Sequence, residues 1–222
     1  MEKISTLTQE QKFILDGVAK IPFFRENFYF TGETALSEFH LRHRYSDDLD
    51  FFTEKKDNLD LQVINSLLAD LGRQYDFTFS GRFIEVVYIT MLTFSNGSQL
   101  KADFGYYPYQ RLKKGIDHQG LAIDSLEDIA FNKLSTVSQR ENIKDFVDLY
   151  FLLKEKHFTL WDLIYGLEVK FKTKVETLLL AEDLLKIEDF DTLPRMIKPL
   201  TFKELQIFFR KIAVELGKKA VE

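Results

Sequence analysis

The hydrophobic pattern of the chain changes its period near residue 124, and this change constrains the fold most strongly. Before that point, short apolar runs either alternate with polar residues or are wholly apolar, as strands require, and a few amphipathic segments separate them. After it, apolar residues recur with the helical period of roughly 3.6. The pattern predicts an α+β protein, in which a mixed β-sheet flanked by helices (1–124) precedes a helical bundle (125–222).

Local signals place the expected elements of the first part. The expected helices lie at 8–20, 33–41 and 59–72, and the expected strands at 27–32, 47–54, 75–80, 82–94 and 99–107. Thr8 is a typical N-cap, and Gly72 is expected to close the third helix. Turns are expected at Ser80-Gly81 and at Asn96-Gly97, since Asn-Gly between two such runs is a strong hairpin signal.

Composition excludes several kinds of site. The chain has no Cys, so disulfides, thiolate metal sites and Cys nucleophiles are absent. Its net charge of −5 argues against a surface built throughout to bind a polyanion, although 30 Lys and Arg leave room for a local basic patch. No apolar run approaches the roughly 18 residues that span a bilayer, and the segment MEKISTLTQEQKF lacks the features of a signal peptide. We therefore expect a cytoplasmic protein with no membrane partner.

Three carboxylates on two predicted strands form the candidate site. In YSDDLDFF (45–52), Asp48 and Asp50 are two residues apart and project from the same face of a strand, whereas Asp47 points the other way. Asp103 lies between apolar residues of a later strand. If the two strands are neighbours, the carboxylates converge. Such a cluster either has perturbed pKa values or binds a hard cation such as Mg²⁺.

A strand-to-helix turn precedes this acidic strand. The run NFYF ends close to Gly32, where a helix is expected to begin. Glycine lets a ligand approach the backbone, and a helix N-terminus offers unpaired N–H groups to a phosphate. A phosphate-binding turn followed by a strand with two carboxylates is the arrangement needed to transfer a nucleotide from a triphosphate.

These motifs resemble those of the AbiEii/AbiGii toxin family, whose nucleotidyltransferase-like proteins belong to the DNA polymerase β-type superfamily. The family pattern is approximately Gly-Gly-Thr-Ala-Leu, a short helix, then Arg-x-Ser-x-Asp-Leu-Asp-Phe. The stretch TGETALSEFHLRHRYSDDLDFF supplies Gly32, Thr34, Ala35, Leu36, Arg44, Ser46, Asp48, Leu49, Asp50 and Phe51. Two later family motifs are matched by Lys133-Leu134 and by Lys144-Asp145, Asp148, Leu149 and Tyr150. The resemblance runs from about residue 8 to 155.

The resemblance implies a nucleotidyltransferase-like fold and a metal-dependent enzyme that moves a nucleoside monophosphate from an NTP to an acceptor hydroxyl. The implied catalytic residues are Asp48, Asp50, Asp103, Lys133, Asp145 and Asp148. The implied ligands of Mg²⁺ or Mn²⁺ are Asp48, Asp50 and Asp103, and the implied phosphate contacts are Gly32, Thr34, Arg44, Ser46 and Lys133. The helical part would contribute its Lys and Asp motifs to the cleft. The family also implies a toxin of a toxin–antitoxin or abortive-infection system, with RNA (the tRNA 3′ end) as acceptor and a cognate antitoxin as partner.

Plain structural interpretations exist for several of these residues. Arg44 could simply pair with a neighbouring acid, and Lys133 could be a surface lysine whose stem covers apolar area. Asp145 and Asp148 are spaced i, i+3 and could form a solvated acidic stripe that pairs with Lys144 or Arg140. The sequence does not indicate which of these two aspartates is functional.

Glu33 departs from the family, which commonly has a second glycine at this position. Its negative charge stands where a triphosphate is expected, although acidic side chains are also favoured in a first helical turn. Two other functions therefore stay open: kinase-like phosphoryl transfer to a protein, and nucleotide or partner binding without catalysis. The base of the NTP, the acceptor, toxicity and the oligomeric state are not readable from the sequence.

Overall fold

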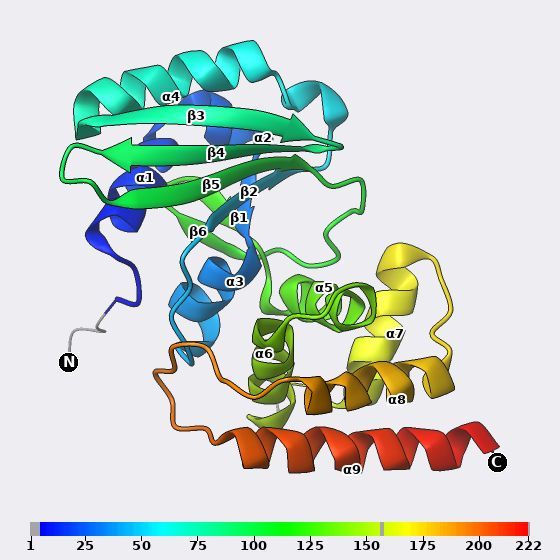
Figure 1. Cartoon of the computed structure of the whole chain (residues 1–222). Helices are drawn as coiled ribbons and strands as arrows, with labels where there is room; N and C mark the ends of the chain where they lie inside the picture. Colours follow the sequence, from blue (N-terminus) through cyan, green and yellow to red (C-terminus); the bar gives the residue numbers. More distant parts are fainter. Residues whose placement is uncertain (1–4, 156–157, 222) are drawn as a thin grey trace. The chain divides into compact units, whose positions relative to one another are not determined.

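The structure, a computed structural model, describes residues 5–155 and 158–221 and has the expected mixed α/β architecture (Figure 1). It consists of two compact units. One comprises Met1–His40 and Ser46–Leu126, and the other comprises Leu41–Tyr45 and Glu127–Glu222.

The first unit is built on a seven-stranded sheet with the order β3-β4-β5-β2-β1-β7-β6. Its strands are β1 (Tyr29–Thr31), β2 (Leu49–Thr53), β3 (Phe77–Ile84), β4 (Val87–Phe94), β5 (Gln99–Tyr106), β6 (Ile116–His118) and β7 (Leu121–Ile123). β2 runs parallel to β5 and antiparallel to β1, and β1 runs parallel to β7. Figure 1 shows β3, β4 and β5 side by side, with α4 along β3.

The first unit also contains helices and helical turns, several of which contact the sheet. They are α1 (Gln9–Lys20), α2 (Pro22–Asn27), α3 (Gly32–Ala35), a π-helical turn (Leu36–Leu41), a 3₁₀ turn (Lys56–Asn58) and α4 (Leu61–Tyr75). The predicted cap of α1 is confirmed, since Thr8 accepts a hydrogen bond from the backbone N–H of Gln11 and the Gln11 side chain accepts one from that of Thr8. This reciprocal capping box satisfies two N–H groups that a helix start leaves open.

An aromatic core fixes β2 in the middle of the sheet. Phe51 is fully buried, and its ring centroid lies 5.3 Å from that of Phe104 on β5 and 5.2 Å from that of Phe30 on β1. Phe24 of α2 stacks on Phe104 at 5.3 Å. Because side chains alternate along a strand, Asp50 projects from the face opposite Phe51. The aromatic residues therefore hold the backbone that carries this carboxylate.

The second unit is helical and includes the short segment Leu41–Tyr45. Its elements are α5 (Leu126–Gln139), α6 (Ile143–Lys154), α7 (Leu160–Phe171), α8 (Thr177–Leu185), a 3₁₀ turn (Lys186–Asp189) and α9 (Phe202–Val221). α8 runs beside α9 (Figure 1), and Phe146 of α6 meets Phe209 of α9 edge to face at 5.3 Å. Among the described residues, no helix is both long enough and apolar enough to cross a membrane.

Two predictions at glycines are wrong: the turn at Ser80-Gly81 and the helix end at Gly72. β3 continues through Ser80 and Gly81, because the Tyr88 ring of β4 covers Gly81, where a Cβ would lie 2.2 Å from the Tyr88 hydroxyl. The turn between β3 and β4 lies further along the chain and interrupts the strand predicted over 82–94. Glu85 in this turn has a positive φ of 53°. α4 likewise runs past Gly72, where a Cβ would lie 2.6 Å from a backbone oxygen, and ends at Tyr75 with Asp76 (φ 58°) as its C-cap. These glycines serve packing.

The Asn96-Gly97 hairpin is confirmed. β4 ends at Phe94 and β5 begins at Gln99, and Gly97 adopts a φ of 84°. The backbone N–H of Gly97 donates to the Phe94 carbonyl at 2.9 Å. Only glycine adopts this conformation at little cost, so the turn fixes the register that places Asp103 on β5.

Candidate active site

Asp50 and Asp103 lie directly opposite each other on the parallel strands β2 and β5. Asp48 immediately precedes β2. Neighbouring strands are about 4.8 Å apart, so these carboxylates share one small region of the sheet. The prediction that the two acidic strands are neighbours is confirmed.

Lys101 is a functional candidate that the sequence reasoning missed. Its Nζ lies 2.7 Å from Oδ2 of Asp103 and 3.1 Å from Oδ2 of Asp48. Burial alone would lower the pKa of Lys101, but its hydrogen bonds and the two negative charges outweigh burial and raise it. The available signal was its spacing, because a residue two positions before Asp103 projects from the same face of the strand.

Burial controls the protonation of the two strand carboxylates. It raises the pKa of Asp50 to about 7, and the negative charges of Asp103 and Glu33 add to this effect. Burial also raises the pKa of Asp103, against the opposing ion pair with Lys101. Carboxylates that resist ionisation in this way are commonly found at functional sites.

The donor set suits a divalent cation. Oδ1 of Asp103 is buried and has no hydrogen-bond partner in the described part of the chain. A buried acceptor without a donor is unfavourable unless a further group binds it. Asp48 shares Lys101 with Asp103, and Asp50 lies opposite Asp103 on β2. Carboxylate oxygens are the ligand type that Mg²⁺ and Mn²⁺ prefer. Lys101 supplies one positive charge at the same place.

Gly32 leaves room for the Asp50 carboxylate. Gly32 follows β1 with a φ of 76°, and a Cβ on it would lie 2.1 Å from Oδ2 of Asp50. A side chain here would meet both steric and backbone penalties. The glycine of the predicted phosphate turn therefore also makes space for one of the three carboxylates.

Side chains from helices hold the segment that carries Asp48. The hydroxyl of buried Thr34 donates a hydrogen bond to the Asp48 carbonyl. Ser46 is buried, and its carbonyl accepts a hydrogen bond of 2.8 Å from Nε2 of Gln11. Thr34 was predicted as a phosphate contact, and this hydrogen bond shows it orienting the backbone of Asp48. Gln11 was not predicted from the sequence.

Asp124 fixes the strand that leads into Gly32. It is fully buried, and its Oδ2 accepts a hydrogen bond of 2.8 Å from the hydroxyl of Thr31. Its backbone N–H donates to the Phe30 carbonyl at 2.8 Å. The sequence reasoning missed Asp124, although a lone acid following the apolar strand β7 was a usable signal.

Asp148 is the centre of a buried charge network in the second unit. Arg44 is fully buried and forms a two-pronged contact, with Nε and Nη2 at 2.6 and 2.8 Å from the two Asp148 oxygens. Lys133 lies 2.7 Å from the same carboxylate, and Nε2 of His43 donates to it at 2.7 Å. Burial alone would raise the pKa of Asp148, but the charges of Arg44 and Lys133 outweigh burial and hold it well below its usual range.

Asp145 extends the same network. Its Oδ1 lies 2.7 Å from Nζ of Lys133, and its Oδ2 accepts a hydrogen bond of 2.7 Å from Nε of Arg140. Both Lys133 and Asp145 are buried. The plain interpretations of Lys133 as a surface lysine, and of Asp145 and Asp148 as a solvated stripe, are therefore wrong in their solvent exposure, although the pairing with Arg140 that the second one included is present. Arg44 does pair with an acid, as its plain interpretation expected.

The predicted residues thus form two groups. Six lie in the first unit, namely Gly32, Thr34, Ser46, Asp48, Asp50 and Asp103. Four lie in the second, namely Arg44, Lys133, Asp145 and Asp148. Arg44 belongs to the second unit because its segment is bound there: backbone N–H groups of residues 197 and 198 both donate to the His43 carbonyl at 2.9 Å.

Comparisons with known proteins identify the family and the fold. The sequence matches the family described as nucleotidyl transferase AbiEii toxin, type IV TA system, over residues 14–216. The uncharacterized protein aq_aa25 of Aquifex aeolicus (strain VF5) is 28% identical over 208 residues, which cover 92% of this chain and 95% of the relative.

Two solved structures show the same fold. JHP933 from Helicobacter pylori has a TM-score of 0.57 at 22% identity, covering 96% of this chain and 94% of its own. MenT4, a nucleotidyltransferase toxin from Mycobacterium tuberculosis, has a TM-score of 0.58 at 14% identity, covering 92% of this chain and 82% of its own.

Proposed function

The chain belongs to the AbiEii family of nucleotidyltransferase toxins, and from this membership we propose that it transfers a nucleoside monophosphate from an NTP to an RNA hydroxyl. The proposed acceptor is a tRNA 3′ end, and the proposed cofactor is Mg²⁺ or Mn²⁺. One observation carries the proposal: Asp50 and Asp103 lie in register, with Asp48 close by and a buried oxygen of Asp103 that no described donor satisfies.

The proposed reaction is an in-line substitution at the α-phosphorus. A bond forms between the acceptor oxygen and the α-phosphorus, the bond to the bridging oxygen breaks, and pyrophosphate leaves. When bound by Asp48, Asp50 and Asp103, the metal would polarise the α-phosphoryl group and stabilise the leaving oxygen. We assign Asp103 as the base that takes the proton of the acceptor hydroxyl.

Residues around the carboxylates position the substrate. Gly32 and Ser46 contact phosphate, and Thr34 keeps Asp48 in place through its backbone hydrogen bond. Glu33 stands at the first turn of α3, and its negative charge raises the pKa of Asp50. A cation bound to Asp50 offsets this repulsion, so Glu33 is compatible with binding of a metal-bound triphosphate.

The helical part supplies positive charge in this proposal. We assign residues 125–222 to a helical domain that contributes Lys133 together with Asp145 and Asp148. The two aspartates fix the position of Lys133, since both contact its ammonium group at 2.7 Å. Arg44 acts as a positioning residue for Asp148, whose two oxygens it binds.

A labelling experiment tests the proposed reaction. The protein is incubated with total RNA, Mg²⁺ and each of the four NTPs labelled at the α-phosphate. Label should pass to RNA with the unchanged protein and should be lost with Asp48→Asn. Asp47→Asn, at an exposed neighbouring position, is the matched control and should retain transfer. Transfer from γ-labelled ATP to protein, with none from α-labelled NTPs to RNA, would contradict the proposal.

The toxin role needs a separate test. We propose that the chain acts with a cognate antitoxin, as the type IV family description implies. Induced expression should slow bacterial growth, and Asp48→Asn should remove this effect while Asp47→Asn preserves it. Co-expression of the neighbouring reading frame should restore growth. Equal toxicity of both variants would separate toxicity from nucleotide transfer.

A further inference from the structure

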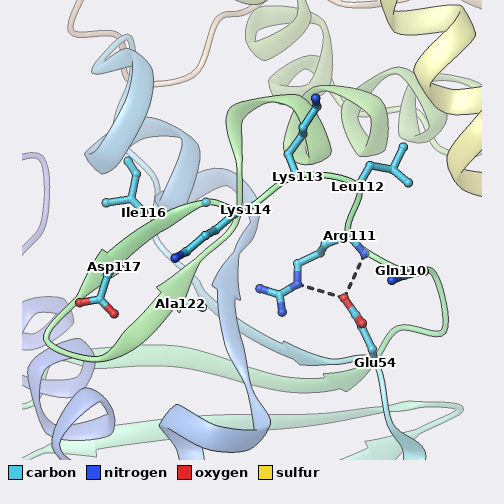
Figure 2. Close-up of a pocket in the computed structure, with 10 residues that line it drawn as sticks. Glu54, Gln110, Arg111, Leu112, Lys113, Lys114, Ile116, Asp117 and Ala122 are labelled. Carbon is cyan, nitrogen blue, oxygen red and sulfur yellow. Dashed lines mark hydrogen bonds and ion pairs between the residues drawn. The ribbon is translucent and has the colours of Figure 1, made fainter.

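A basic pocket lies in the first unit, away from the three carboxylates. Its volume is about 420 Å³, and it is formed mainly by the connection between β5 and β6 (Figure 2). Its lining residues are Glu54, Gln110, Arg111, Leu112, Lys113, Lys114, Gly115, Ile116, Asp117 and Ala122. Glu54 follows β2, whereas Asp48 precedes it. At about 3.3 Å per residue, roughly 20 Å of strand separates them.

Arg111 is held rigidly at this pocket. Oε1 of Glu54 accepts hydrogen bonds of 3.0 Å from both the backbone N–H and the Nε of Arg111. The guanidinium carbon lies 4.1 Å from the centre of the Tyr29 ring. In Figure 2 the terminal nitrogens of Arg111 point away from Glu54. A guanidinium fixed in this way keeps part of its planar fork available for an anion at low entropic cost.

Two exposed lysines follow Arg111 on the same loop. Gly115 lets the loop approach β7 closely, since a Cβ there would lie 1.8 Å from the Ile123 carbonyl oxygen, and exposed Lys113 and Lys114 directly precede this contact. The lining contains three cationic side chains and two acidic ones. Glu54 is engaged by Arg111, and Oδ1 of Asp117 accepts a hydrogen bond from a backbone N–H. The pocket is therefore locally positive on a chain whose net charge is −5.

Aromatic rings precede the cationic residues on this loop. The rings of Tyr107 and Tyr109 meet edge to face at 5.2 Å, and Tyr109 is 38% exposed. Tyr107 is anchored by Phe52 of β2, at 5.7 Å between ring centres, and its backbone N–H donates to the Thr53 carbonyl. Sites for single-stranded nucleic acid combine positive charge that follows the backbone with aromatic rings on which bases stack.

We propose that residues 107–117, which we call the basic loop, bind the backbone of the RNA acceptor strand at a distance from the reacting carboxylates. The inference rests on the proposed function, because it names the surface that recognises the proposed RNA substrate. The pocket beside Arg111 receives a phosphate, Lys113 and Lys114 contact neighbouring phosphates, and Tyr109 offers its exposed ring to a base. The negative net charge makes such a local patch necessary for RNA binding.

RNA binding without NTP tests the basic loop directly. The affinity of a short fluorescent single-stranded RNA is measured by anisotropy at several salt concentrations. Each phosphate contact to a single strand contributes about 0.7 to the slope of log affinity against log salt, so Lys113→Ala/Lys114→Ala should reduce the slope by about 1.4 and weaken binding roughly tenfold at low salt. Both lysines are exposed, and circular dichroism should show that the double variant folds.

The matched control changes charge equally in the other unit. Lys203→Ala/Lys211→Ala removes two exposed lysines of α9 and should leave the slope and the affinity unchanged. An equal loss with this control would mean that net charge alone governs binding, which overturns the inference. An unchanged slope in Lys113→Ala/Lys114→Ala would overturn it as well.

Two further outcomes distinguish failure of the RNA surface assignment from failure of the proposed reaction. If RNA binding depends on Lys113 and Lys114 but no NTP labels any RNA, the surface assignment stands and the proposed reaction fails. If label transfer occurs with an unchanged slope in the double variant, the reaction stands and the basic loop is not its RNA surface. Displacement of RNA by an acidic peptide of equal charge, at equal concentration, would indicate a protein partner and overturn the RNA assignment.

Discussion

The ammonium group of Lys101 lies 2.7 Å from Oδ2 of Asp103, so the chain's own cation pairs with a carboxylate proposed to bind metal. Lys101 and a divalent ion must then compete for the same negative charge. We expect Lys101→Met to bind Mn²⁺ at least about fivefold more tightly, since even in water two unit charges 4 Å apart interact by about 1 kcal/mol. Calorimetry or the electron paramagnetic resonance signal of free Mn²⁺ measures the change.

The control for this prediction is Lys55→Met, which makes the same charge change at an exposed position after β2. Its Mn²⁺ affinity should change by less than about twofold, because exposed charges are strongly screened. Without metal, Lys101→Met should also melt at a lower temperature than Lys55→Met, because Asp48 and Asp103 then repel each other without a shared cation. Unchanged or weaker Mn²⁺ binding by Lys101→Met would contradict the competition.

Gly32→Ala should lower the free energy of unfolding by more than the cost of its left-handed backbone conformation alone. A left-handed conformation costs a non-glycine residue roughly 1–2 kcal/mol. Gly97 also has a positive φ, of 84°, but apart from its chain neighbours no atom in the described part of the chain lies within 4 Å of a Cβ placed there, whereas a Cβ on Gly32 would lie 2.1 Å from Oδ2 of Asp50. Gly97→Ala is therefore the control for the backbone cost, and Gly32→Ala should lose at least about 1 kcal/mol more in urea unfolding. Adding Asp50→Ala should recover part of that excess, and equal losses for the two glycines would rule out the contact.

Arg44→Met should destabilise the protein by about 3–5 kcal/mol, because it leaves the fully buried Asp148 short of its main partner. The matched control is Arg73→Met, which breaks an ion pair with Asp70 whose two side chains are 74% and 56% exposed. Exposed pairs contribute only about 0–1 kcal/mol. Urea unfolding of both variants measures the difference. Similar losses at the two positions would show that the Arg44 pair contributes no more than a surface contact.

Features that depend on neighbouring residues were predictable from the sequence. The alternation of side chains along β2 places Asp50 on the face opposite Phe51, and the Asn96-Gly97 pair determines a hairpin, because both follow from backbone geometry over a few residues. Asp48 itself precedes β2 and lies outside it, although the strand was predicted over 47–54. The capping box of α1 is a local signal of the same kind. Local rules therefore found the strands that carry the candidate site.

Contacts between distant parts of the chain were not predictable. The hydrogen bond from Thr31 to Asp124 joins residues 93 positions apart, and the one from Gln11 to the Ser46 carbonyl joins residues 35 apart. Gly81 illustrates the same limit, because its role depends on a ring from the next strand. A single sequence can mark Asp124 as a lone acid after an apolar strand, but it does not identify the residue that pairs with it, since pairing depends on which surfaces meet after folding.

The acid sensitivity of the fold should depend on His43. His43 is fully buried, its Nε2 donates to Asp148, and burial lowers its pKa below the usual 6.5. In the unfolded chain, His43 binds a proton as the pH falls below about 6.5, while the folded chain does not, so protonation favours unfolding. His43→Gln retains a donor for Asp148 and removes the titration. The unfolding free energy of the unchanged protein, minus that of His43→Gln, should be constant above about pH 7.5 and should fall below pH 6.5 with a limiting slope of about 1.4 kcal/mol per pH unit. Urea unfolding across pH 5 to 8 measures this difference, and a flat difference would show that His43 is protonated equally in both states.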